Sequence, residues 1–196
     1  LYAGLGVRIQ VNWTSRNRTL RLTEDGVCQA ELARPKAAAE NLAMVRPLQP
    51  PLIEDNAAVF GIGAPNARYQ KLSDLKGRHI GLPEHETGLR AAAQGLTVKL
   101  YADETALFRA LVNGEIDLVV ARQWAGLLVL RSHFANSGIR QQARSILPLP
   151  LYHLVRTGHP ELEKALAREI LKSRRSGEEL QYLDGLLRKL ARRAKS

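Results

Sequence analysis

Polar and charged residues follow two apolar, strand-like segments of the sequence. The first group, Glu84-His85-Glu86-Thr87-Gly88, comes directly after a strand predicted at Arg78–Leu82 and opens the next helix. A helix N-terminus presents unpaired main-chain N–H groups and favours an anionic group such as a carboxylate. We therefore expect Glu86, Thr87 and Gly88 to contact a ligand. The alternative, equally well supported, is that Glu86 and Thr87 only cap the helix.

The second group, Arg122-Gln123-Trp124, follows the buried strand predicted at Ile116–Ala121. An arginine can pair with a carboxylate through two parallel hydrogen bonds, and a tryptophan can pack on an apolar part of a ligand. Ligands gather at the carboxyl ends of strands in open α/β sheets, so we expect Arg122, Gln123 and Trp124 to line the same site. For Trp124, packing into the core is the slightly favoured interpretation.

Two further candidates lie in the first part of the chain. Trp13 ends a strand predicted at Val7–Trp13, and Arg34 ends the next predicted strand, so both side chains are candidates to face a ligand cleft. For Arg34, a solvated surface arginine is nearly as good an interpretation. A solvated basic face of a helix is the favoured interpretation of three neighbouring arginines, Arg16, Arg18 and Arg21.

Other kinds of chemistry are not indicated by the sequence. His85-Glu86 begins the zinc-binding pattern H-E-x-x-H, but Leu89 stands where the second histidine is required. Cys28 is the only cysteine, which excludes an intrachain disulfide. There is no G-x-S-x-G motif and no glycine-rich loop of the phosphate-binding type. We therefore expect no metal site, no cofactor and no enzymatic activity.

The composition of the 196 residues is typical of a globular protein, with 45% hydrophobic and 24% charged residues. The net charge is +10, which makes nucleic acid and anionic membranes candidate partners. Five basic and no acidic residues lie between Arg188 and Lys195, and we interpret this run as a solvated chain end. Aromatic residues, at 5%, are too few for a base-stacking platform, so we expect no nucleic-acid partner.

Strand and helix signals alternate along the chain, which predicts an α/β fold with mainly parallel sheet. The clearest elements are three strands and a helix, at Arg78–Leu82, Val98–Tyr101, Ile116–Ala121 and Glu104–Asn113. Proline-containing connectors at Pro47–Pro51 and Pro148–Pro150 flank the middle third of the chain. This pattern predicts two lobes joined by two crossing segments, near Val59–Gly63 and Leu149–Val155.

Four segments resemble, in order, parts of one known family. They are Asp25–Arg34, Leu72–Leu82, Asp103–Asp117 and the stretch from Tyr152 through Ser176-Gly177-Glu178. The second contains Asp74-Leu75-Lys76-Gly77, and the third ends in Gly114 followed by Ile116-Asp117. In this order they resemble the bacterial extracellular solute-binding proteins of family 3, the amino-acid-binding components of ABC transporters. A Thr-x-x-Arg carboxylate clamp like that of the family is not evident.

The resemblance implies a type II periplasmic-binding-protein-like fold, with residues 1–60 and 150–196 in lobe one and 61–149 in lobe two. It implies a monomer that closes by hinge motion on a small polar or anionic, amino-acid-like solute in the cleft between its lobes. The partner would be an ABC permease or a sensor at the membrane, and the location periplasmic or extracellular. The position of Arg122 is one where the family contacts ligand. The family's first strand and a signal sequence are expected upstream of Leu1.

The alternative is the effector-binding domain of a transcription regulator of the LysR type, which shares this lobe architecture. Its DNA-reading domain would then lie upstream of Leu1. The predicted C-terminal helices and the basic chain end resemble the solute-binding proteins more closely.

Overall fold

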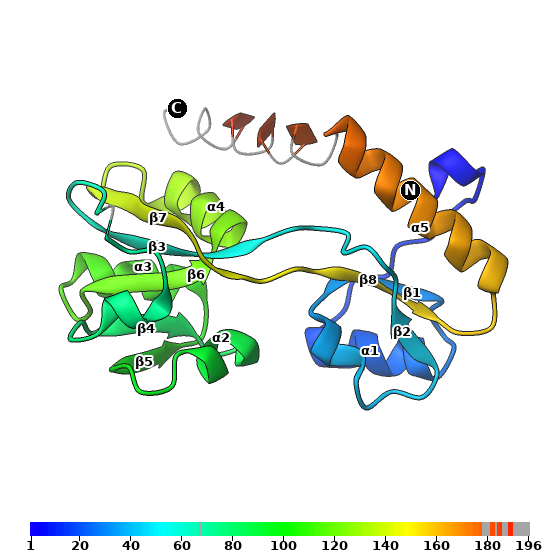
Figure 1. Cartoon of the computed structure of the whole chain (residues 1–196), viewed down its shortest axis with the longest axis horizontal. Coiled ribbons are helices and arrows are strands. Elements are labelled where there is room, and N and C mark those ends of the chain that lie inside the picture. The colour runs from blue at the N-terminus through cyan, green and yellow to red at the C-terminus, as the bar shows by residue number, and fades with distance from the viewer. Residues whose placement is uncertain (67, 178–180, 183, 186–187, 190–196) are drawn as a thin grey trace. The chain divides into compact units, whose positions relative to one another are not determined.

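The computed structural model describes residues 1–66, 68–177, 181–182, 184–185 and 188–189 (Figure 1). These residues form two compact units, which we call unit 1 and unit 2. Of the described residues, unit 1 contains those within Leu1–Glu54 and Pro150–Gln181, and unit 2 contains those within Asp55–Leu149 and from Tyr182 onward. The chain therefore enters unit 2 between Glu54 and Asp55 and leaves it between Leu149 and Pro150. Most of the basic chain end predicted at 188–195 lies outside the described residues.

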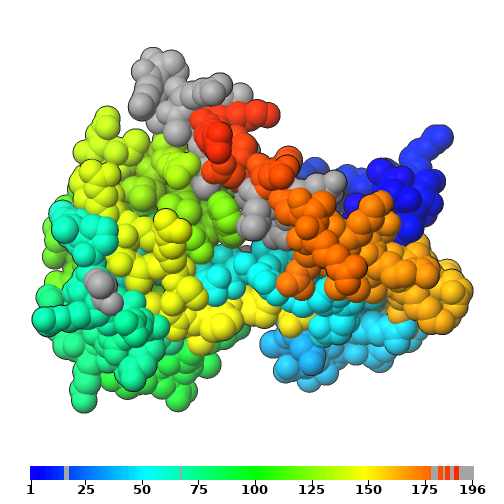
Figure 2. Space-filling view, turned by 45° about the horizontal axis from the view of Figure 1, so that its top comes forward, coloured from blue at the N-terminus to red at the C-terminus, as the bar shows by residue number. Residues whose placement is uncertain are grey.

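Unit 1 is built on a three-stranded sheet with β8 (Tyr152–Arg156) in the centre. It is antiparallel to β1 (Ala30–Arg34) on one side and to β2 (Val45–Pro47) on the other. Two α-helices, α1 (Arg16–Glu24) and α5 (Pro160–Ser176), and two 3-10 helices, η1 (Ala3–Leu5) and η2 (Lys36–Ala39), complete the unit. Helix α5 lies at the surface (orange in Figures 1 and 2) and buries Leu166 and Ile170 against Val155 and Leu48.

Unit 2 is built on a five-stranded sheet in the order β5-β4-β6-β3-β7. The strands are β3 (Asn56–Ile62), β4 (Ile80–Pro83), β5 (Val98–Tyr101), β6 (Leu118–Arg122) and β7 (Ile139–Pro148). Strand β4 is parallel to β5 and β6, whereas β3 is antiparallel to β6 and β7. The register places Gly81 opposite Lys99 and Val119, and Val59 opposite Val120 and Ala143.

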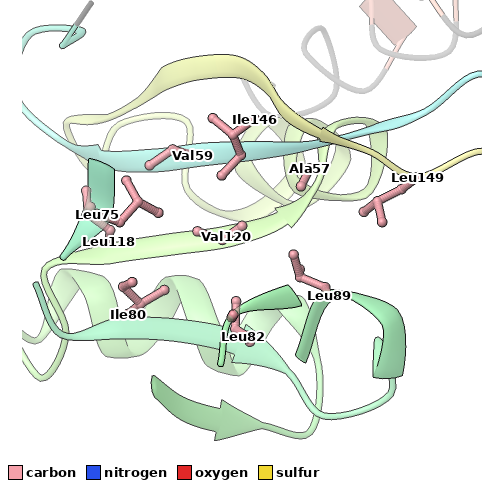
Figure 3. Close-up of a cluster of buried hydrophobic side chains, with 11 residues drawn as sticks. Ala57, Val59, Leu75, Ile80, Leu82, Leu89, Leu118, Val120, Ile146 and Leu149 are labelled. Carbon is pink, nitrogen blue, oxygen red and sulfur yellow. The ribbon is translucent and has the colours of Figure 1, made fainter. Parts of the chain in front are cut away.

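Three α-helices and one 3-10 helix accompany this sheet. They are α2 (Thr87–Ala92), α3 (Glu104–Val112), α4 (Gln123–His133) and η3 (Leu72–Leu75). Successive strand residues point to opposite faces of a sheet, and the core is divided accordingly. Val59, Val120 and Leu82 belong to one buried cluster with Leu89 of α2 (Figure 3). The neighbouring strand residues Phe60, Val119 and Ala121 belong to the other, with Leu107, Phe108 and Leu111 of α3.

The predicted α/β class is confirmed, but the sheets are not mainly parallel. Parallel pairing in the described residues is confined to β4 with its neighbours β5 and β6. A parallel pair requires a crossover connection, and α2 and α3 supply the crossovers between these three strands. The strands β3 and β7 carry the chain into and out of unit 2 and therefore run in opposite directions.

The strand predicted at Val7–Trp13 is wrong, since residues 7–15 form neither helix nor strand. The apolar side chains alternate as in a strand, but all of them are exposed, and Trp13 is 92% exposed. A strand requires a neighbour that satisfies its main-chain N–H and C=O groups. Within the described part of the chain, no main-chain hydrogen bond joins residues 8–14 to another segment.

The crossing segment predicted at Val59–Gly63 is also wrong. Val59 and Phe60 are fully buried in β3, between β6 and β7. The first crossing therefore comes earlier, between Glu54 and Asp55. The apolar stretch that resembled a connecting segment is instead an interior strand of unit 2.

Candidate functional site

The two polar groups predicted to form a site lie next to each other in unit 2. Strands β4 and β6 are parallel neighbours, so the residues that follow them emerge at the same edge of the sheet. Nε of Arg122 donates a hydrogen bond to Oε1 of Glu86 at 2.8 Å. This bond joins the β4–α2 loop, with Thr87 and Gly88, to the β6–α4 junction, with Gln123 and Trp124.

The guanidinium group of Arg122 makes its hydrogen bonds and ion pairs with residues of unit 2. Its Nη1 donates to the main-chain oxygen of Leu149 at 2.6 Å and lies 3.8 Å from Oδ2 of Asp55. Arg122, Glu86 and Asp55 are all more than nine-tenths buried. The two carboxylates neutralise the arginine, and such a pair is costly to break. The expected bidentate pairing of Arg122 with a ligand carboxylate conflicts with these contacts at Nε and Nη1.

Asp55, the first residue of unit 2, completes this network. Its carboxylate accepts a hydrogen bond from the main-chain N–H of Asn56 at 2.8 Å, and the main-chain N–H of Trp124 also lowers its pKa. Its main-chain oxygen accepts a hydrogen bond from the N–H of Leu149 at 2.8 Å. Burial raises the pKa of Asp55, and these N–H donors and the charge of Arg122 oppose that rise. Asp55 therefore ties the start of β3 to α4 and to the end of β7.

Acidic groups outnumber basic ones at this edge. Nε2 of His85 lies 3.7 Å from Oε1 of Glu86 and 3.6 Å from Oε1 of Glu104, the first residue of α3. With Asp55, three carboxylates thus lie around Arg122 and His85. The edge carries negative charge that a positively charged group of a ligand would complement.

The capping role considered for Glu86 is wrong. Glu86 occupies the N-cap position of α2, but its side chain makes no capping hydrogen bond and turns to Arg122 instead. Thr87 and Gly88 are exposed, and a Cβ atom added at Gly88 would meet nothing within 4 Å. Trp124 is half-buried and belongs to neither apolar cluster of unit 2, so the core-packing interpretation is not supported.

The other two predicted residues belong to unit 1. Arg34 is the last residue of β1, and its Nε lies 3.2 Å from Oε1 of Glu31. Its side chain is only 12% exposed, so it is not the solvated surface arginine of the alternative interpretation. Trp13 lies in the exposed segment that forms no strand.

The sequence candidates omitted Asp55 and the carbonyl of Leu149. The acidic pair Glu54-Asp55 directly before the strand Asn56–Ile62 is the only sequence signal for Asp55. No three His, Cys, Asp or Glu side chains gather as a metal site in the described parts of either unit. No helix among the described residues is long and apolar enough to cross a membrane.

The sequence matches no protein-family model and none of the curated proteins compared with it. Solved structures do match. The GluR0 ligand-binding core in complex with L-glutamate aligns with a TM-score of 0.73 and 14% identity, over 96% of this chain and 84% of that one. The second substrate-binding domain of a putative amino acid ABC transporter from Streptococcus pneumoniae Canada MDR_19A aligns with a TM-score of 0.69 and 17% identity, over 94% and 84%.

An ancestral arginine-binding protein bound to glutamine also matches, with a TM-score of 0.63 and 19% identity, over 96% of this chain and 82% of that one. At such identities the likeness concerns the fold. It extends over nearly the whole chain and agrees with the order of segments noted in the sequence. The chain therefore has the type II periplasmic-binding-protein-like fold of the solute-binding proteins that its sequence resembles.

Proposed function

We propose that the chain binds a small, polar, amino-acid-like solute in a cleft between its two units, which close on it by hinge motion. The supporting observation is the fold shared over 96% of the chain with structures that hold L-glutamate and glutamine. The solute would then be passed to an ABC permease or reported to a sensor at the membrane. Both roles place the protein in the periplasm or outside the cell.

Within unit 2 we assign the solute contacts to Thr87, Gly88, Gln123 and Trp124. Arg122 and Glu86 are positioning residues in this proposal, because each is held by the other and by buried neighbours. The carboxylates around Arg122 and His85 favour a solute with an amino group over a purely anionic one. Arg34 and Trp13 remain the candidate contacts of unit 1.

A thermal-shift screen of L-amino acids, small carboxylates, polyamines and sugars tests the proposal. A solute that binds only the folded chain stabilises it by about 2.7 kcal/mol at a hundredfold excess over its Kd. The chain has only two tryptophans, Trp13 and Trp124. In the Trp13→Phe variant, Trp124 is the single tryptophan, and its fluorescence should change saturably with the solute that shifts the melting temperature of that same variant.

Two threonines provide a matched pair of variants. Thr87→Ala should weaken solute binding, since its hydroxyl is exposed at the carboxyl end of β4. Thr97→Ala removes an exposed hydroxyl at the opposite end of the sheet, just before β5, and should leave binding unchanged. A screen in which no solute class raises the melting temperature would overturn the proposal.

A further inference from the structure

Helix α5 carries a row of basic side chains along its outer side. Lys164, Arg168, Lys172 and Arg175 follow one another at intervals of three or four residues, which places them on one face of an α-helix. All four are exposed, and Leu171 lies among them, 42% exposed. We call these five residues the basic stripe. The opposite side of α5 is buried in unit 1 through Leu166 and Ile170, whereas the residues of the basic stripe are exposed.

The helix dipole does not account for the basic stripe. Basic residues stabilise a helix mainly in its last turn, and in α5 the last turn contains Arg174 and Arg175. Lys164 and Arg168 lie further towards the N-terminus, beyond the range of that effect. The helix dipole therefore does not explain why both residues are basic.

Internal ion pairs do not neutralise the basic stripe either. Lys164 lies 3.0 Å from Glu161 and Lys172 lies 3.8 Å from Glu169, but the two lysine side chains are 69% and 75% exposed. Exposed pairs of this kind contribute little and are easily exchanged for other partners. Arg174, in contrast, points away from the stripe and pairs with Glu54.

We propose that the basic stripe docks the protein on an anionic phospholipid surface. A straight row of cationic side chains on a surface helix can contact a flat layer of phosphate headgroups at all points simultaneously. Leu171 supplies an apolar side chain that can enter the headgroup region. The net charge of +10 adds a long-range attraction, and the sequence provides a second basic segment between Arg188 and Lys195.

The test is co-sedimentation with vesicles of phosphatidylcholine, with or without phosphatidylglycerol. The chain should bind only the vesicles that contain phosphatidylglycerol, at about 0.05 M salt and much less at about 0.5 M salt, where the charges are screened. Arg168→Glu/Lys172→Glu should lower the partition coefficient by at least about thirtyfold, since each basic residue near such a surface contributes about 1 kcal/mol and the two glutamates add repulsion.

A matched control is available on α1. Arg18→Glu/Arg21→Glu changes two exposed arginines of the same unit. Each replacement of a basic residue by glutamate lowers the net charge by two, so both double variants have a net charge of +6 instead of +10. If binding depends on the basic stripe, the control retains most of the affinity. Equal losses in both variants would show that only net charge matters and would overturn the proposal.

Two further outcomes also decide the question. Absence of binding to phosphatidylglycerol vesicles overturns the proposal, and so does stripe-dependent binding to duplex DNA without binding to vesicles. If circular dichroism shows that a glutamate variant is misfolded, the corresponding glutamine pairs replace both. Arg168→Gln/Lys172→Gln should then lose more affinity than Arg18→Gln/Arg21→Gln. Solute binding is measured separately, so failure of either proposal leaves the other testable.

Discussion

Arg122 holds Leu149 at the point where the chain leaves unit 2, through a hydrogen bond of 2.6 Å from Nη1 to the main-chain oxygen. The N–H of Leu149 in turn donates to the oxygen of Asp55, where the chain enters the unit. The two ends of this stretch are therefore fixed to each other and to one guanidinium. Because Arg122 also holds Glu86, the β4–α2 loop is part of the same network.

We expect Arg122→Ala to lower the free energy of unfolding by about 3–5 kcal/mol, because Asp55 and Glu86 would remain buried without their cationic partner. Arg122→Lys should recover only part of this loss, since an ammonium group lacks the forked donor geometry. Urea unfolding measures both. The exposed Arg140 is the control, and its replacement by alanine should change stability by at most about 0.5 kcal/mol. A loss at Arg122 no larger than that of the control would refute this account.

The sequence was a good guide where local pattern and tertiary pairing agree. The strand predicted at Val98–Tyr101 is β5, and the helix predicted at Glu104–Asn113 is α3 with one residue fewer at its end. Strand β7 was not predicted, because its buried and exposed residues do not alternate regularly. It forms a strand because its main chain pairs with β3, and this long-range pairing leaves no local sequence signal. Val7–Trp13 shows the converse, an alternating pattern that has no strand to pair with.

The site could be predicted only in part for a similar reason. The closeness of Glu86 and Arg122 follows from parallel β4 and β6, which the alternating strands and helices indicated. The partners of Arg122 do not follow from any local pattern. Asp55 is far from Arg122 in the sequence, and the oxygen of Leu149 belongs to the main chain, so neither has a sequence signature.

The N-cap of α3 provides a test of local stability. Oδ1 of Asp103 accepts a hydrogen bond from the N–H of Ala106 at 2.8 Å. Removal of such a cap costs about 1 kcal/mol, so we expect Asp103→Ala to lower the melting temperature measurably. Asp103→Asn keeps an oxygen in the same position and should cost less. Equal losses for the two variants would show that this hydrogen bond is not the source of the effect.

Two glycines with opposite surroundings test the packing of unit 2. A Cβ atom added to Gly126 of α4 would lie 2.5 Å from Cε2 and Cζ of Phe60. Phe60 is itself buried against Phe108, so Gly126→Ala should cost about 1–3 kcal/mol despite the better helix propensity of alanine. Gly88→Ala enters open space and should be neutral or stabilising by up to about 1 kcal/mol. Similar effects of the two changes on urea unfolding would contradict this packing.

His153 of β8 is the buried histidine of unit 1 for which a pH effect is expected. Its Nδ1 lies 3.1 Å from the main-chain oxygen of Leu32, and its Nε2 lies 2.7 Å from the hydroxyl of Tyr2. A neutral ring satisfies both contacts if Nδ1 carries the proton and Nε2 accepts the hydroxyl proton. Burial lowers the pKa of His153 below its ordinary value of 6.5.

The direction of the pH dependence follows from this lowered pKa. Below about pH 6.5 the unfolded chain binds a proton at His153 that the folded chain does not yet bind, so unfolding becomes easier as the pH falls. The free energy of unfolding continues to fall until the pH reaches the pKa that His153 has in the folded chain. We expect urea unfolding at about pH 5.5 to require less denaturant than at about pH 7.5, and His153→Gln to reduce this difference. His133→Gln, at an exposed histidine, should retain it. If His153→Gln retains the full difference, the pH dependence originates in other groups.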